Sequence, residues 1–145
     1  LNYDQLKKSI NIFIFIFTTL MIISVGAGGA LGAIARYLVG MAISHHLPNH
    51  GWLATLSVNI VGCFAMGIMA AILIESPSVS PAVRSFVMIG FLGALTTFSS
   101  FALDIHILLD KHGFMAGAGY LITSVGLSLA MFFAGMWLFR AGSGQ

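Results

Sequence analysis

The stretch Gly90-Phe-Leu-Gly-Ala-Leu-Thr-Thr-Phe-Ser-Ser-Phe101 decides how this chain is interpreted. It lies within a long apolar run, yet it contains two glycines, two phenylalanines three positions apart, and four hydroxyl side chains within residues 96–100. Threonine and serine hydroxyls compete for helical backbone hydrogen bonds. At membrane depth, non-helical backbone is tolerated only where protein buries it or an aqueous path borders it. The stretch therefore predicts an interrupted membrane helix beside a binding site or a pathway.

The composition of the whole chain is that of a membrane protein. Of its 145 residues, 59% are hydrophobic and only 7% are charged, and the mean hydropathy is +1.02. Soluble domains carry about 25% charged residues, which excludes that class here. The formal net charge of +2 is too small to indicate a nucleic-acid partner. The single cysteine, Cys63, has no internal disulfide partner, and the histidines lack zinc-site spacing.

Four apolar runs are long enough to span a bilayer, since each span needs about 20 apolar residues; they cover residues 10–43, 52–74, 83–109 and 114–139. We expect an all-α membrane protein with one four-helix domain at residues 12–140. Tails at 1–11 and 141–145 would flank this domain. A cleaved signal peptide ending near Gly26 or Gly28 is disfavoured, because the first run continues past that point and three more runs follow.

Lysine and arginine are nearly balanced between the two ends of the spans. Four lie on the side of the N-terminus and two on the other: Lys7, Lys8, Arg84 and Arg140 against Arg36 and Lys111. Positive residues favour the cytoplasmic side, so this weak bias permits insertion in both orientations. Arg36 lies about two turns inside the expected end of its span, where its long side chain can reach the surface in a vestibule or structural role.

Small residues recur at four-residue spacing in the apolar runs. They are Gly28 and Gly32, Gly113 and Gly117, and the stripe Gly126, Ala130 and Ala134. Such patterns let helix backbones approach closely in a membrane. Because four thin helices bury little surface between them, we expect a homo-oligomer, most simply a two-fold dimer.

Polar side chains inside the runs form a second pattern. Asn59 follows Thr55 by one turn in the second run, and the fourth run carries Tyr120, Ser124 and Ser128 at four-residue spacing. An unpaired amide in hydrocarbon costs about 4–8 kcal/mol, so Asn59 either bonds to another helix or points its NH₂ at a ligand. Three hydroxyls in register favour a helix that lines a pathway.

The chemistry of these groups favours a small anion. Amide and hydroxyl donors, together with the positive ring edges of phenylalanine, can hold an anion without a fixed cation. Asp104 is the only carboxylate well inside a run, and the first run has none. A small dual-topology, proton-coupled drug exporter, the main alternative, would need a membrane carboxylate in its first span. A non-transporting scaffold, the other alternative, leaves the buried amide and the paired phenylalanines unexplained.

Three motifs in this order resemble the Fluc/CrcB family of fluoride channels: Gly28-Gly-Ala-Leu-Gly-Ala-Ile-Ala-Arg-Tyr37, Thr55-Leu-Ser-Val-Asn-Ile-Val-Gly-Cys63 and the stretch 90–101. The resemblance implies a multi-pass channel of the bacterial inner membrane that exports fluoride passively, and not an enzyme. Its functional unit would be an antiparallel, dual-topology homodimer with two pores. Phe98 and Phe101 would contact fluoride through their ring edges, and Asn59 would be the pore amide.

The resemblance also implies further site residues. Polar pore or vestibule groups would be Thr55, Ser99, Ser100, Tyr120, Ser124 and Ser128. A structural sodium ion would lie on the dimer axis, held by the backbone carbonyls of Gly93 and Thr96 from both protomers. The family usually has glycine at position 94, where this chain has Ala94.

Overall fold

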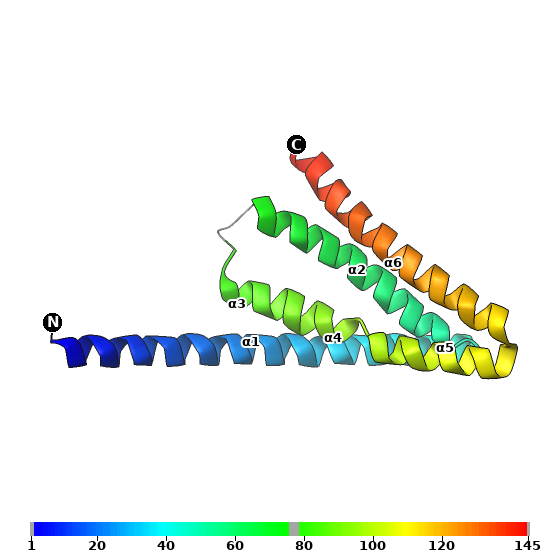
Figure 1. Cartoon of the computed structure of the whole chain (residues 1–145), viewed down its shortest axis with the longest axis horizontal. Helices are drawn as coiled ribbons and strands as arrows, with labels where there is room; N and C mark the ends of the chain where they lie inside the picture. Colours follow the sequence, from blue (N-terminus) through cyan, green and yellow to red (C-terminus); the bar gives the residue numbers. More distant parts are fainter. Residues whose placement is uncertain (1, 76–78, 145) are drawn as a thin grey trace.

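The computed structural model describes residues 2–75 and 79–144, and the elements it contains over these ranges are all helical (Figure 1). They are α1 (Tyr3–His46), α2 (Trp52–Glu75), α3 (Pro81–Arg84), the π-helix η1 (Ser85–Leu92), α4 (Gly93–Leu95), α5 (Phe98–His112) and α6 (Phe114–Ser143). Four stretches are long and apolar enough to cross a membrane: Tyr3–His46, Trp52–Leu73, Pro81–His112 and Phe114–Ser143. The expected all-α membrane protein with four spans is confirmed.

Helix α1 begins at Tyr3, so the residues that we assigned to an N-terminal tail are helical. Asp4 lies in its first turn and His45 and His46 in its last, which suits the helix dipole. Its 44 residues extend over about 66 Å at 1.5 Å per residue. A hydrocarbon core is only about 30 Å thick. Figure 1 shows the N-terminal part of α1 running beyond the other helices, so only part of α1 can lie inside the bilayer.

The α1–η1 seam, where α1 packs on η1, is built on glycine. A methyl group on Gly28 would collide with the backbone carbonyl of Phe86, and one on Gly32 with that of Phe91. Gly90 of η1 faces back onto the backbone of α1 beside Gly28. The packing role predicted for Gly28 and Gly32 is confirmed, and the third span therefore lies with its backbone directly against α1.

The pair α2 and α6 uses the same device. A methyl group on Gly67 would collide with the carbonyl of Phe132, and one on Gly135 with the carbonyl of Phe64. The stripe that begins at Gly126 behaves differently, because Gly126 has open space around its Cα. Close packing was expected there, but within the described protomer the approach to α2 occurs through Gly67 and Gly135 instead.

The third span is composed of α3, η1, α4 and α5, and its helix is interrupted between Leu95 and Phe98. Thr96 (φ −79°, ψ 153°) and Thr97 (φ −152°, ψ 127°) have extended backbone between α4 and α5. Helix α5 then begins at Phe98, and the Thr97 side chain caps it by accepting from the Ser100 amide at 3.2 Å. Extended backbone at this depth leaves peptide groups that need partners outside the helix.

Candidate functional site

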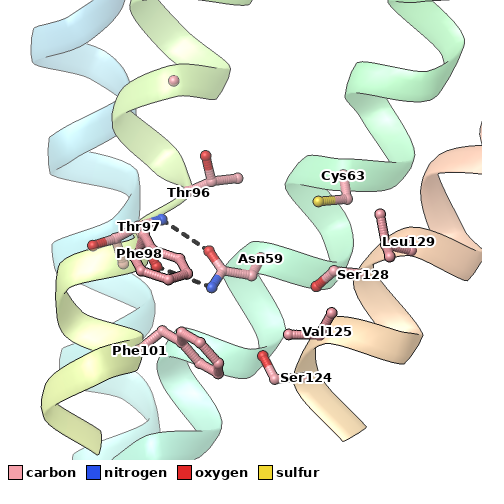
Figure 2. A pocket seen from close by; sticks show the side chains of 11 residues that line it. Asn59, Cys63, Thr96, Thr97, Phe98, Phe101, Ser124, Val125, Ser128 and Leu129 are labelled. Carbon is pink, nitrogen blue, oxygen red and sulfur yellow. Dashed lines mark hydrogen bonds between the residues drawn. The ribbon is translucent and has the colours of Figure 1, made fainter. Parts of the chain in front are cut away.

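A cavity of about 420 Å³ lies where the extended residues of the third span face α2 and α6 (Figure 2). Its lining comprises Asn59, Cys63, Gly93, Thr96, Thr97, Phe98, Phe101, Ser124, Val125, Ser128 and Leu129. We call it the aromatic pocket. Seven of its eleven lining residues are among the site residues predicted from the sequence, and none of the eleven carries a formal charge.

Asn59 holds the extended backbone in place. Its Oδ1 accepts a hydrogen bond from the Thr97 amide at 2.8 Å, and its Nδ2 donates to the Thr97 carbonyl at 3.1 Å. Thr97 is buried, so these two bonds satisfy peptide groups that have left the helix. The amide carries two N–H donors, and this pairing uses one of them. Asn59 therefore bonds to the third span, which is one of the two alternatives expected from the sequence. Its second N–H donor remains beside the pocket.

The Thr97 hydroxyl is the centre of a small polar cluster that sequence reasoning missed. Besides capping α5, its Oγ1 donates to Ser100 Oγ at 3.2 Å and lies 3.2 Å from Ser99 Oγ. Ser99 and Ser100 therefore surround Thr97 and do not line the pocket. Two signals could have identified Thr97: it belongs to the helix-weakening stretch, and Asn59 required a partner with both a donor and an acceptor.

The two phenylalanines occupy different environments. Their ring centroids are 5.4 Å apart with planes inclined by 52°. Phe101 is 5% exposed, whereas Phe98 is 78% exposed in the protomer. Figure 2 shows both rings on the side of the pocket formed by α5, opposite Ser124 and Ser128 of α6. The buried ring of Phe101 therefore forms one edge of the pocket, and the exposed ring of Phe98 forms the other.

The remaining predicted residues lie around Tyr120. This residue is buried against Phe101, with ring centroids 5.5 Å apart, and its hydroxyl lies 3.4 Å from Asp104 Oδ2. The hydroxyls of Thr55 and Ser124, both buried, are beside that of Tyr120. The structure thus brings three of the predicted polar residues, Thr55, Tyr120 and Ser124, together beside the pocket. Arg36 is half-buried on α1 and lies outside the pocket lining.

The backbone carbonyls of Gly93 and Thr96 lie at the interruption of the third span, where their usual helical partners bond elsewhere. In a continued helix the Thr97 amide would reach the Gly93 carbonyl, but here it bonds to Asn59. Likewise the Ser100 amide, which would reach the Thr96 carbonyl in a continued helix, bonds to the Thr97 hydroxyl. Unwound carbonyls are the ligand type that membrane proteins use for Na⁺. The predicted pair therefore fits a sodium ion chemically. The described ranges contain no cluster of three His, Cys, Asp or Glu residues that would suit a transition metal.

Comparison with known proteins agrees with this architecture. The family model described as CrcB-like protein, camphor resistance (CrcB), matches residues 23–136. A "fluoride-specific ion channel FluC" of Rhodospirillum centenum is 44% identical over 120 residues, which cover 83% of this chain and 95% of the relative. A protein of the same name from Rhizobium meliloti is 45% identical over 121 residues, covering 83% and 96%. The resemblance inferred from the three motifs is confirmed, and this chain belongs to the CrcB family.

Proposed function

We propose that this protein is a passive, fluoride-selective channel of the bacterial inner membrane, which lets fluoride leave the cytoplasm and so limits its toxicity. The observation that carries the proposal is the uncharged lining of the aromatic pocket, where an amide, hydroxyls and two phenylalanines converge. The curated relatives carry the name of this function. A channel of this kind needs no catalytic residue, and we propose none.

The donors suit fluoride for a physical reason. Fluoride is small and strongly hydrated, so its water must be replaced by closely spaced donors if it is to cross. The second N–H of Asn59, the Ser124 and Ser128 hydroxyls and the positive edges of Phe98 and Phe101 provide such contacts. Each contact is weak enough to be exchanged for the next one, as conduction requires. A proton-coupled exporter would instead need a carboxylate in the pathway, and the pocket lining has none.

We further propose an antiparallel homodimer as the functional unit. Phe98 is 78% exposed in the protomer although it borders the pocket, and a second copy packed on this face would enclose it. The near balance of lysine and arginine agrees with insertion in both orientations. Two versions with added lysines at opposite ends should each lose fluoride transport and should regain it when co-expressed. Full transport by one fixed-orientation version would contradict the dimer.

A structural Na⁺ at the dimer axis is proposed for the carbonyls of Gly93 and Thr96, whose helical partners bond elsewhere. Two copies related by a two-fold axis would supply four carbonyl ligands, and the buried cation would also attract a passing anion. Replacing sodium by N-methylglucamine throughout purification should lower the thermal midpoint of the dimer and its fluoride flux. Unchanged values after verified sodium removal would contradict the site.

The function itself is tested with purified protein in liposomes. Vesicles loaded with fluoride or with chloride are diluted into a buffer that contains neither ion, and efflux is followed with ion-selective electrodes while valinomycin balances the charge. We expect rapid fluoride efflux and chloride efflux at the level of protein-free vesicles. Comparable chloride efflux would contradict selectivity. Fluoride efflux that requires an imposed proton gradient would contradict passive conduction and favour the exporter.

A further inference from the structure

A row of five aromatic rings leaves the aromatic pocket and continues toward the end of the spans where α2 begins. Successive centroids are 5.4 Å apart from Phe98 to Phe101, 5.5 Å from there to Tyr120, 5.6 Å on to Trp52, and 6.2 Å to His50. The rings come from α5, α6, α2 and the loop before α2. Residues distant in sequence therefore form one continuous aromatic path.

The far end of this path opens into a second cavity, which we call the mouth cavity. It has a volume of about 730 Å³, and it is lined by Pro48, Asn49, His50, Gly51, Trp52, Asp104, Ile107, Leu108, Lys111, His112 and Ala116. Trp52 lines the mouth cavity and contacts Tyr120, which in turn contacts Phe101 of the aromatic pocket. Tyr120 and Trp52 thus lie between the two cavities.

Tyr120 and Trp52 each carry one side-chain hydrogen-bond donor between the two cavities, and only that of Tyr120 has a partner in the part of the protein that the structure describes. The single O–H of Tyr120 is directed at Asp104 Oδ2, 3.4 Å away. The Trp52 indole N–H, a donor without acceptor capacity, has no hydrogen-bond partner within residues 2–75 and 79–144. Trp52 is only half-buried and faces the mouth cavity. This donor is therefore available to a ligand in the mouth cavity, which Trp52 lines.

We propose that Trp52 binds the permeating anion where the mouth cavity meets the aromatic path, through its indole N–H and ring edge. This inference rests on the proposed fluoride channel and adds a contact that precedes Phe101 and Phe98. Lys111 lines the same cavity and favours entry of an anion, while the Asp104 carboxylate opposes it and accepts a hydrogen bond from the Tyr120 hydroxyl. Trp52 would then supply an uncharged donor where the mouth cavity meets Tyr120.

A purely structural role for Trp52 is the competing explanation, because Trp52 also packs on the buried cluster of Phe101, Leu108 and Tyr120. Trp52→Phe separates the two roles, since it keeps a ring against Tyr120 and removes the N–H. The matched control is Trp137→Phe on α6, which changes the other tryptophan of the sequence at a 70% exposed position. Both variants should have the thermal midpoint of the unaltered protein.

We expect Trp52→Phe to lower initial fluoride efflux about tenfold, as for loss of one hydrogen bond to a charged group, while Trp137→Phe conducts normally. Normal conduction by Trp52→Phe would overturn the inference. The proposed function fails differently, because in that case the unaltered protein itself would show no fluoride efflux.

A second readout does not depend on conduction. In the Trp137→Phe protein, Trp52 is the remaining tryptophan of the sequence, so its fluorescence can be titrated with sodium fluoride and, separately, with sodium chloride. We expect a saturable change with fluoride and none with chloride. No fluoride-dependent change in a sample that conducts fluoride would overturn the inference, even if Trp52→Phe should fail to fold.

Discussion

The α1–η1 seam and the aromatic pocket belong to the same third span but are built on opposite principles. In the seam, glycines let the backbones of α1 and η1 touch. In the pocket, the backbone of Thr96 and Thr97 leaves the helix and is held by the amide of Asn59. In the seam, residues without side chains let two helices pack closely. In the pocket, a polar side chain stabilises the extended backbone that interrupts a helix.

The difference indicates how each region contributes. The glycine contacts of the seam determine where the third span lies, whereas the pocket presents amide and hydroxyl groups to a ligand. Substitutions in the seam should therefore act on folding, and substitutions in the pocket should act increasingly on transport alone. The expected effect on folding is largest in the seam and becomes smaller in the pocket.

Gly32→Ala should have the largest effect, because its methyl group would collide with the backbone carbonyl of Phe91. Backbone cannot move aside as a side-chain end can, so the helices must separate. We expect a loss of at least about 1–3 kcal/mol, the usual cost of overpacking, seen as loss of the monodisperse peak in size-exclusion chromatography. Gly29→Ala is the control on the same helix, where the added methyl group meets open space; equal behaviour of the two variants would refute the seam.

Asn59→Ala should affect folding and transport together. It removes both bonds to Thr97 and leaves the buried Thr97 N–H unpaired, at about 1–3 kcal/mol. It also removes the donor proposed for fluoride. We expect a lower thermal midpoint in detergent and a fluoride flux near background for the protein that remains folded. An unchanged midpoint would mean that the Thr97 pairing does not stabilise the structure.

Thr97→Val should have a smaller effect, because Asn59 bonds to the backbone of Thr97 and not to its side chain. The change removes the hydroxyl that caps α5, which costs about 0.5–2 kcal/mol. Fluoride flux per folded protein should stay within about twofold, as for a change of under about 0.5 kcal/mol. A greater loss of flux than in Asn59→Ala would mean that the Thr97 hydroxyl, and not the pairing of its backbone with Asn59, matters most for conduction.

Several features of the fold could be predicted from sequence because they depend on local composition. The four spans follow from apolar runs of sufficient length, and the weakness of residues 90–101 as a helix follows from their glycines and hydroxyls. The extent of α1 could not be predicted in this way. Its first residues include Asp4, Lys7 and Lys8, and a hydropathy pattern does not distinguish a charged helical end from a charged tail.

The site depends on contacts between distant residues, and there the sequence is less informative. That Asn59 needs a partner could be predicted from its burial in an apolar run, but the choice of Thr97, 38 positions away, depends on how the spans pack. Trp52 shows the same limit: its position at the start of α2 gives no sign that its ring meets Tyr120 of α6. Gly126 shows that spacing alone can also mislead. Its spacing predicted close helix packing, but in the protomer Gly67 and Gly135 make that contact.

If the aromatic pocket is part of the fluoride path, its side chains must contribute to conduction and not only to packing. A matched pair of phenylalanines tests this most directly. Phe98 and Phe114 are the first residues of α5 and α6 and are 78% and 76% exposed, but only Phe98 borders the pocket. Methionine fills similar space without an aromatic edge, so neither Phe98→Met nor Phe114→Met should shift the thermal midpoint.

The measurement is initial fluoride efflux per folded protein for these two variants, reconstituted side by side. We predict that Phe98→Met loses flux about tenfold, equivalent to about 1.4 kcal/mol at the barrier, while Phe114→Met conducts like the unaltered protein. Full flux through Phe98→Met, or an equal loss in both variants, would contradict the account, because the pocket would then be packing and the fluoride path would lie elsewhere.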